Sequence, residues 1–325
     1  MGVIIEKPGL LTTVQDLGRS GYQRDGIMVS GAMDTLSMRL ANILVGNDDG
    51  EAVLEVTLIG PTLVFTIDTF IAITGAHISP MINQIPIQMH RPIFVKSGDK
   101  LTFGTIQSGC RSYVAFKGGI HVPKLLGSRS THLTAKFGGL NGGPLTRNAI
   151  LTIKSFDYRN VPIHKWRLSS YYQQIVFNQD PIRFIKGRQY HLFKEESKRN
   201  FTTSTYILSK DANRIGYRFN GPELLLTNQQ EMLTEGVTFG SVQVPANGKP
   251  IILMADRQPT GGYPKIAQII ACDLPRLAQL KPGDSVSFSE ISMKQAQALA
   301  YEREKELKAL RKIILNIWKE CINKC

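Results

Sequence analysis

The amino-acid sequence predicts a mainly β protein made of two related β-barrel subdomains and a long amphipathic C-terminal helix. Three observations indicate this: short strand-like runs, segments repeated in the same order in both halves, and a change to helical spacing near residue 292. A chain of 325 residues is long enough for two domains that each bury a core. We therefore expect barrel domains at residues 1–170 and 171–291, and a helix at 292–325.

The strand-like runs are rich in Val, Ile, Thr and Phe and are bounded by Gly, Pro, Asn and Asp. Clear examples are TLVFTI (62–67), FIAITG (70–75), SYVAFKG (112–118) and PIILMA (250–255). These side chains suit a pleated, half-buried surface, and such frequent turn signals are typical of barrels or sandwiches.

An internal duplication predicts that the two barrels are related. VSGAMDTLSMRL (29–40) aligns with LSKDANRIGYRF (208–219), IGPTLVF (59–65) with NGPELLL (220–226), and VKSGDKLTF (95–103) with LKPGDSVSF (280–288). The pairs occur in the same order in both halves, which indicates a repeated unit. The junction is expected near residues 165–180, and each Gly-Asp pair is expected to form a hairpin turn.

From about residue 292 the apolar residues recur three and four positions apart, as in Leu307, Leu310, Ile314 and Ile317. This spacing places them on one face of a helix. We expect that helix to pack on its own barrel or on a partner.

Composition excludes several classes of protein. Apolar residues make up 42% of the chain and charged residues 20%, and no apolar run approaches the ~20 residues that span a bilayer. The N-terminal residues do not resemble a signal peptide, so we expect a cytoplasmic protein without a membrane segment. The four cysteines and six histidines lack the spacing of metal ligands, and no metal site is expected.

The net charge of +13 is concentrated in residues 165–218, where basic residues far outnumber acidic ones. This stretch could steer an acidic protein or substrate, or it could be a solvated basic face. Nucleic acid is not an expected partner, because aromatic and basic residues are not interleaved as in known modules.

Residues 10–34 form the first stretch with more polar residues than a turn requires. It contains Gln15, Asp16 and Arg19, followed by a predicted helix entry with Ser30, Gly31 and Asp34, all of which we treat as candidate substrate-binding residues. Backbone N–H groups at a helix start can hold a carboxylate or phosphate. Ordinary capping by Ser30 or Asp34 is the alternative.

The second stretch, residues 118–145, combines many glycines with Arg129, whose guanidinium could bind an anion through two hydrogen bonds. The G-x-x-x-x-G-K-[ST] pattern is absent from the chain, so an autonomous ATP site of that type is not expected. A biotin-attachment sequence of the A-M-K-M kind is also absent.

The third stretch, ADRQPTGGYP (255–264), joins two strand-like runs. Gly261 and Gly262 allow close approach of the backbone to a ligand, and Asp256 and Arg257 place a carboxylate and a guanidinium at a strand end. An internal Asp–Arg pair closing a turn is the alternative. The first half of the chain has no counterpart of this loop, so the repeated fold does not by itself require it.

These motifs resemble the KipA or allophanate-hydrolase subunit 2 family. The resemblance covers about residues 3–290 and rests on KPGLLTTVQDLGRSGYQRDGIMVSGAMD, LGSRSTHLTAKFGG, RIGYRFNGPEL and ADRQPTGGYPKIAQIIACDLPRLAQLKPGD. It implies two cyclophilin-like β barrels. It also implies a role as the C-type component of an ATP-dependent 5-oxoprolinase, which hydrolyses 5-oxo-L-proline to L-glutamate together with a KipI-like B component and a LamB/YcsF-like A component.

Carried over by position, the family motif identifies the substrate-facing loop. Asp256, Arg257 and Tyr263 are expected to be catalytic, and Gln258, Thr260, Gly261 and Gly262 to bind the substrate. In the implied mechanism, the lactam oxygen is phosphorylated from ATP while Arg257 and the two glycine amides stabilise its charge. Asp256 would orient water or the ring N–H.

The resemblance leaves two other functions open. One is carboxyl transfer to urea or a related amide by a biotin-dependent carboxylase, whose biotin carrier would be a separate protein. The other is a regulatory module that binds a KipI-like kinase inhibitor.

Overall fold

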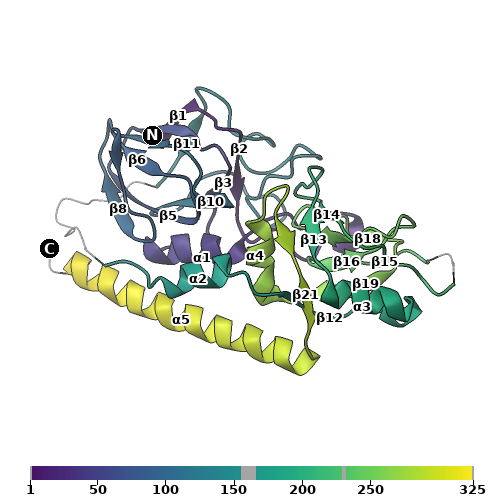
Figure 1. Ribbon diagram of the computed structural model, residues 1–325. Helices are drawn as coiled ribbons and strands as arrows, with labels where there is room; N and C mark the ends of the chain where they lie inside the picture. Colours follow the sequence, from purple (N-terminus) through teal and green to yellow (C-terminus); the bar gives the residue numbers. More distant parts are fainter. Residues whose placement is uncertain (1, 155–165, 229–231, 324–325) are drawn as a thin grey trace. The chain divides into compact units, whose positions relative to one another are not determined.

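A computed structural model of the chain describes residues 2–154, 166–228 and 232–323 and shows two compact units. The first contains residues 1–19, 30–175 and 305–325, and the second contains residues 20–29 and 176–304 (Figure 1). The division differs from the predicted domains, because residues 20–29 and the start of the C-terminal helix group with the second unit, whereas residues 171–175 and 305–325 group with the first. Residue 165 of the predicted junction lies outside the described residues.

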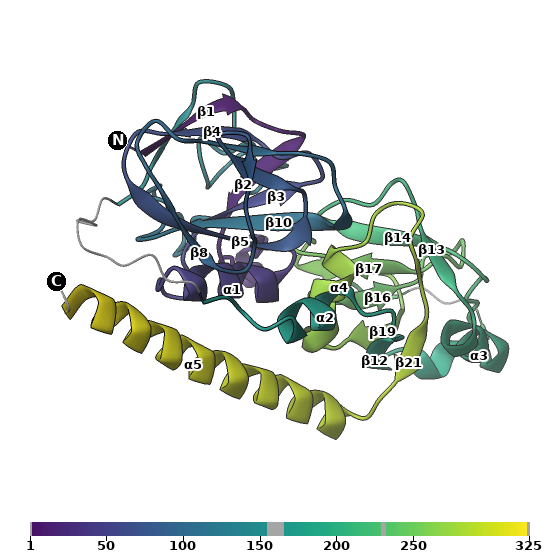
Figure 2. The same cartoon turned by 60° about the vertical axis from the view of Figure 1, so that its left-hand side comes forward.

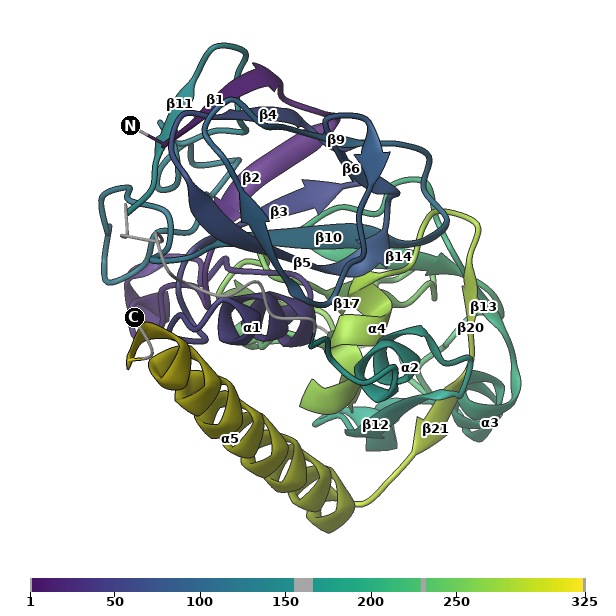
Figure 3. The same cartoon turned by 90° about the vertical axis from the view of Figure 1, so that its left-hand side faces the viewer.

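The first unit is built from two antiparallel sheets that face each other (Figure 3). The six-stranded sheet has the order β11-β1-β4-β9-β6-β7, and the five-stranded sheet has the order β2-β3-β10-β5-β8. The strands of the former are β1 (Gly2–Lys7), β4 (Thr62–Phe65), β6 (Pro80–Ile82), β7 (Ile85–Pro86), β9 (Lys100–Phe103) and β11 (Ile150–Thr152). Those of the latter are β2 (Leu11–Gln15), β3 (Val53–Thr57), β5 (Thr69–His77), β8 (Pro92–Val95) and β10 (Ser108–Phe116).

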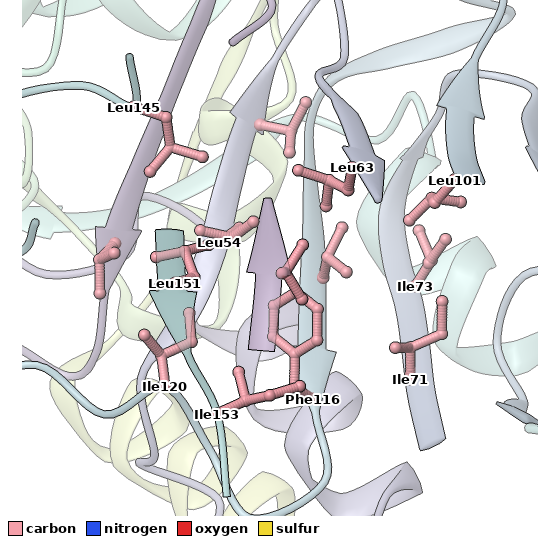
Figure 4. Close-up of a cluster of buried hydrophobic side chains, with 14 of the residues drawn as sticks. Leu54, Leu63, Ile71, Ile73, Leu101, Phe116, Ile120, Leu145, Leu151 and Ile153 are labelled. Atoms are coloured by element: carbon pink, nitrogen blue, oxygen red, sulfur yellow. The ribbon is translucent and has the colours of Figure 1, made fainter. Parts of the chain in front are cut away.

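The core of this unit lies between the two sheets (Figure 4). Leu54, Ile73 and Phe116 come from the five-stranded sheet, and Leu63 and Leu101 from the six-stranded one; all are fully buried. Strands β5 and β10 are buried on both faces, because helix α1 (Thr35–Leu44) packs against their other side (Figure 3). This explains the unbroken apolar runs at residues 70–73 of β5 and 113–116 of β10, where alternation would otherwise be expected.

The second unit contains an eight-stranded sheet in the order β20-β13-β14-β17-β16-β19-β12-β21 (Figure 2). Its first and last members, β20 and β21, are separated in sequence only by Ser287. Val286 pairs with Tyr206 of β13, and Phe288 pairs with Ile182 of β12, so one short segment joins both edges and closes the sheet into a barrel.

The barrel and its neighbouring elements have the following bounds. The barrel strands are β12 (Ile182–Lys186), β13 (Tyr206–Leu208), β14 (Gly216–Asn220), β16 (Ser241–Gln243), β17 (Ile251–Leu253), β19 (Lys265–Ile269), β20 (Ser285–Val286) and β21 (Phe288–Glu290). A separate two-stranded sheet consists of β15 (Glu235–Gly236) and β18 (Thr260–Gly261). Helices α3 (Glu195–Thr203) and α4 (Leu274–Ala278) accompany them, and α2 (Tyr171–Phe177) contains the boundary between the units. Three short 3-10 helices cover Gln23–Asp25, Tyr190–Leu192 and Ala271–Asp273.

The predicted long C-terminal helix is confirmed as α5 (Met293–Asn323) (Figure 1). Its residues 305–323 belong to the first unit, where Trp318 is 4% exposed and donates a hydrogen bond to the Leu44 carbonyl. The Trp318 ring also contacts Phe70 edge-on and lies under the Lys117 ammonium, 3.8 Å from the ring centroid. Within the described residues, no helix combines the length and apolar character needed to cross a bilayer.

The mainly β prediction is confirmed, but the duplication is only partly reflected in local structure. Gly98 and Gly283 both have φ of 93°, and Asp99 and Asp284 each accept a hydrogen bond from the N–H of the lysine three residues earlier. These two turns are equivalent, as predicted.

The alignment of 29–40 with 208–219 is wrong at the level of structure. The Asp34 carboxylate accepts a hydrogen bond from the Ser37 N–H and caps helix α1. Asn213, its aligned residue, accepts from the N–H groups of Ile215 and Gly216 and closes a turn between two strands instead.

The buried His90 should make the first unit sensitive to acid. Burial, together with the nearby His77, lowers its pKa to about 4. The unfolded chain binds this proton near pH 6.5, so the free energy of unfolding should fall by about 2–3 kcal/mol as the pH drops from 6.5 to 4. Urea titrations across this range should show a shallower decrease for His90→Asn, which tolerates the native φ of 62°. An equal decrease in both proteins would contradict the assignment to His90.

Candidate functional site

The candidate loop, residues 256–264, connects β17 to β19 and is held along its whole length. The Asp256 N–H donates to the Arg214 carbonyl, and the Pro259 and Pro264 carbonyls accept from Val237 and Val244. Between them, β18 pairs with β15 through Thr260 and Gly261. A loop fixed at its start, middle and end presents its side chains in one geometry, which favours binding without a large cost of ordering.

Asp256 does not pair with Arg257, as the turn-closing alternative supposed. Its two carboxylate oxygens accept hydrogen bonds from Nε and Nη2 of Arg214, at 2.8 and 3.0 Å. Both residues are buried, with 3% and 5% of their surfaces exposed. The structure therefore places Asp256 in an anchor that holds the start of the loop.

Arg257 is the charged group that the loop leaves without an acidic partner. Its guanidinium lies 5.7 Å from the centroid of the Phe239 ring and donates one hydrogen bond of 3.3 Å, to the Met254 carbonyl. In the part of the chain that the structure describes, nothing accepts a hydrogen bond from its buried Nε. Burial lowers the pKa of Arg257 to about 10, and the Asp256 carboxylate opposes that change. The group therefore remains cationic at neutral pH and can accept an anion.

The remaining predicted residues of the loop differ in exposure. Gln258 is half-buried, Thr260 is exposed, and the Tyr263 side chain is 50% exposed. Gly262 and Tyr263 line a cavity with a volume of about 740 Å³. The structure thus places Arg257 near one end of the loop and a cavity wall at the other.

Two supporting residues were not predicted from the sequence. Arg214 anchors Asp256, and Glu235 accepts hydrogen bonds of 2.7 Å from Gln189, Arg188 and Lys265. The hydrogen bond from Lys265 is the main cause that lowers the pKa of Glu235. Arg214 opens the family motif RIGYRFNGPEL, which could have marked it, whereas Glu235 stands in none of the quoted motifs.

The basic stretch 165–218 is partly neutralised inside the second unit. Five of its cations form ion pairs with acidic residues: Arg183 with Asp273, Lys186 with Glu290, Arg188 with Glu235, Lys198 with Glu195, and Arg214 with Asp256. The surface that could attract an anionic partner is therefore smaller than the sequence alone indicated.

The candidate residues of the first half meet in one buried network of the first unit. The Asp16 carboxylate accepts hydrogen bonds from Ser128 Oγ at 2.6 Å, Ser130 Oγ at 2.5 Å, and the N–H groups of Gly18 and Arg129 at 2.8 and 2.6 Å. A carboxylate with four donors is fully satisfied. Asp16 therefore ties β2 to the glycine-rich stretch.

Arg129 and Arg19 are also engaged internally. Arg129 donates to the Glu51 carboxylate at 2.6 Å and to the Val122 carbonyl at 3.0 Å. Arg19 is 1% exposed, donates to the Ser130 carbonyl, and stacks over Phe137. Neither guanidinium is presented to solvent as an anion site.

Gln15, Ser30, Gly31 and Asp34 complete this region. The Gln15 amide donates to Thr13 and to the Thr131 carbonyl, and Gly31 has a φ of 93° beside the Asp16 carbonyl. Asp34 acts as the helix cap that the sequence offered as the alternative. Ser30 is buried with a φ of 56°. The structure brings these residues together, in a role that stabilises the fold.

No group of three or more His, Cys, Asp or Glu residues able to hold a metal occurs among the described residues. The second-unit loop itself presents a half-buried cation, backbone amides and a tyrosine beside a cavity.

Comparison with known proteins decides the family. The model of the family described as "Carboxyltransferase domain, subdomain A and B" matches residues 25–290. The chain belongs to this carboxyltransferase-domain family.

Relatives of this carboxyltransferase-domain protein confirm the resemblance predicted from its motifs. It is 38% identical to the C component of the 5-oxoprolinase of Escherichia coli K12 over 94% of this chain and 96% of that protein. It is 37% identical to the corresponding 5-oxoprolinase component of Haemophilus influenzae, over 93% and 95% of the two chains. The structure of K. lactis urea amidolyase matches with a TM-score of 0.86 at 31% identity, over 95% of this chain and 20% of that one.

The two glycines of the loop in this carboxyltransferase-domain protein give a matched pair of variants. A Cβ on Gly261 would lie 2.6 Å from Nε2 of the buried Gln243, which donates to the Tyr263 carbonyl, whereas a Cβ on Gly262 meets nothing closer than 3.6 Å. Gly261→Ala should therefore lower the free energy of unfolding by about 1 kcal/mol through loss of this hydrogen bond, and Gly262→Ala should change it by less than about 0.5 kcal/mol. Urea unfolding of the two variants measures the difference. Equal effects would show that Gln243 does not hold the loop.

Proposed function

We propose that this chain is the C component of an ATP-dependent 5-oxoprolinase complex that hydrolyses 5-oxo-L-proline to L-glutamate. The similarity to two proteins that bear this 5-oxoprolinase name extends over almost the full length of both. The proposal includes a KipI-like B component and a LamB/YcsF-like A component as partners, ATP used by the complex, and a cytoplasmic location.

One observation carries the assignment of the site. Arg257 is a half-buried cation on a loop held by hydrogen bonds, and its buried Nε donates to no described residue. A guanidinium in this state strongly favours an oxygen that carries negative charge. The oxygens of the phosphoryl group that is transferred to the lactam oxygen of 5-oxoproline are such atoms.

The proposed reaction assigns different tasks to the loop residues. Arg257, with the Gly261 and Gly262 amides, stabilises the charge of the phosphoryl group while it passes from ATP to the lactam oxygen and ADP leaves. Water then attacks the activated carbon, the C–N bond of the ring breaks, and the ring nitrogen takes a proton to become the amine. A second water hydrolyses the resulting γ-glutamyl phosphate to L-glutamate and inorganic phosphate. Asp256 is assigned to positioning, because its carboxylate is committed to Arg214.

The likeness to urea amidolyase supports a second candidate function. The TM-score of 0.86 over 95% of this chain fits carboxyl transfer to urea or a related amide. In that case, a biotin carboxylase and a biotinylated carrier on other polypeptides would supply the carboxyl group.

Reconstitution distinguishes the candidates. The purified chain is combined with the KipI-like and LamB/YcsF-like proteins of the same genome, and glutamate is measured with 5-oxo-L-proline in the presence and absence of ATP. We expect ATP-dependent glutamate formation that requires all three proteins. Activity only with urea, bicarbonate and a biotinylated carrier would favour the carboxyltransferase. A complex with the KipI-like protein that is inactive with both substrate sets would favour the regulatory module.

A further inference from the structure

The cavity beside the loop has a wall composition that the reaction does not explain. It has a volume of about 740 Å³ and belongs wholly to the second unit. Most of its lining is apolar: Leu224, Leu225, Leu226, Met232, Val244 and Pro245, with Gly262, Tyr263 and Pro264 on the loop side. This volume exceeds what a molecule as small as 5-oxoproline requires, which indicates a larger occupant.

Of the described residues that line the cavity, Lys194 alone is charged. Across residues 2–154, 166–228 and 232–323, no acidic side chain pairs with its ammonium group, whereas Lys186, Lys198 and Lys265 each have a glutamate partner. Among the described residues, no carboxylate lines the cavity either. Within this part of the chain, the cavity is therefore an apolar surface with one positive charge that no acidic side chain pairs with.

Large apolar side chains at and beside the cavity are left in water. Leu233, next to the lining residue Met232, is 91% exposed, Tyr263 is 50% exposed, and Leu225 is 39% exposed. A small-molecule pocket buries its walls around the ligand, whereas apolar side chains that project from a rim are typical of a surface that another protein covers. We call these three residues and the cavity the Leu233 surface.

We propose that the Leu233 surface is the docking site for the KipI-like protein, which inserts an apolar segment into the cavity and places an aspartate or glutamate against Lys194. The inference rests on the proposed function, since it takes its partner from there. Charge complementarity selects an acidic segment, and the exposed leucines and tyrosine select an apolar one. The docked segment would contact Tyr263 directly, so that binding of the KipI-like protein reaches the catalytic loop.

Binding of the purified KipI-like protein to the full chain, measured by isothermal titration calorimetry, tests the proposal. Leu233→Asp and Lys194→Glu should each raise the dissociation constant by about tenfold or more. The first places a carboxylate against an apolar segment, and the second places one against an acidic side chain. Ile207→Asp and Lys210→Glu are matched controls on strand β13 and the turn after it, both exposed, and should change affinity less than about twofold. Circular dichroism and thermal unfolding establish that all four variants fold.

The outcomes separate this proposal from the proposed function. If the wild-type chain binds the KipI-like protein and the Leu233 and Lys194 variants bind equally well, the docking site is wrong and the function stands. If those variants bind normally but raise the KM for 5-oxoproline, the cavity is a substrate pocket and the docking site is again overturned. If the wild-type chain does not bind the KipI-like protein at all, the assigned partner is wrong, and the docking proposal falls with it.

Discussion

Arg257→Ala is expected to lower kcat/KM for 5-oxoproline in the reconstituted complex by a factor of about 100 to 1,000. The variant removes a cation whose charge is poorly solvated and whose Nε has no acceptor among the described residues. Such a group interacts more strongly with charged phosphoryl oxygens than a fully exposed arginine would, because water screens its field less. The ATP-dependent rate of glutamate formation is the measurement.

Two further variants complete this test: Arg257→Lys is the conservative replacement, and Arg199→Ala is the control. Lysine keeps the positive charge but lacks the planar fork, so an intermediate rate is expected if the geometry of two donors matters. Arg199 is an exposed residue of helix α3, and its replacement by Ala should leave the rate unchanged. Because the pKa of Arg257 is lowered only to about 10, its charge should not shape the rate profile between pH 6 and 9. Full activity of Arg257→Ala in a properly assembled complex would remove this residue from the mechanism.

Asp256→Asn is expected to destabilise the second unit by about 3–5 kcal/mol, since it leaves the buried Arg214 guanidinium without its counter-charge. For a unit of this size that corresponds to a decrease in Tm of about 10 °C. Scanning calorimetry of the purified chain measures it. The rate of glutamate formation should also fall, because the start of the loop is released.

The double variant Arg214→Met/Asp256→Leu separates charge from packing. It replaces the ion pair by apolar side chains of comparable length and should recover most of the lost stability. Recovered stability with low activity would identify the pair as a positioning device for Arg257. If Asp256→Asn unfolds at the same temperature as the wild type, the ion pair does not anchor the loop.

The sequence predicted the elements whose formation depends on nearby residues. The Gly-Asp turns at 98–99 and 283–284 form as expected because the glycine φ and the aspartate side chain act within four residues. The C-terminal helix also follows from local spacing. The predicted equivalence of residues 29–40 and 208–219 was wrong, because similar side chains at aligned positions make different local hydrogen bonds. Asp34 accepts from Ser37 and starts a helix, whereas Asn213 accepts from Ile215 and closes a turn.

The sequence predicted where the candidate site lies along the chain, but it did not predict what each of its residues contacts. Polarity marked both residues 10–34 and residues 255–264, yet polarity does not disclose the partner that each group finds in space. Asp16 finds donors in the loop around residue 129, more than a hundred positions away, and Asp256 finds Arg214, 42 positions away. On the described loop, Arg257 alone has a buried side-chain donor without an acceptor. This depends on burial and on distant contacts, which no local sequence pattern encodes.

The closure of the second barrel by residues 285–290 has a consequence for how the chain matures. Strands β12 and β13 are made early in the second half, but the segment that covers both of their outer edges is made last, just before α5. During synthesis, these two edges therefore expose unpaired N–H and C=O groups to neighbouring chains. A chain interrupted before residue 285 would retain almost every core side chain of this barrel and still be prone to self-association through its open edges.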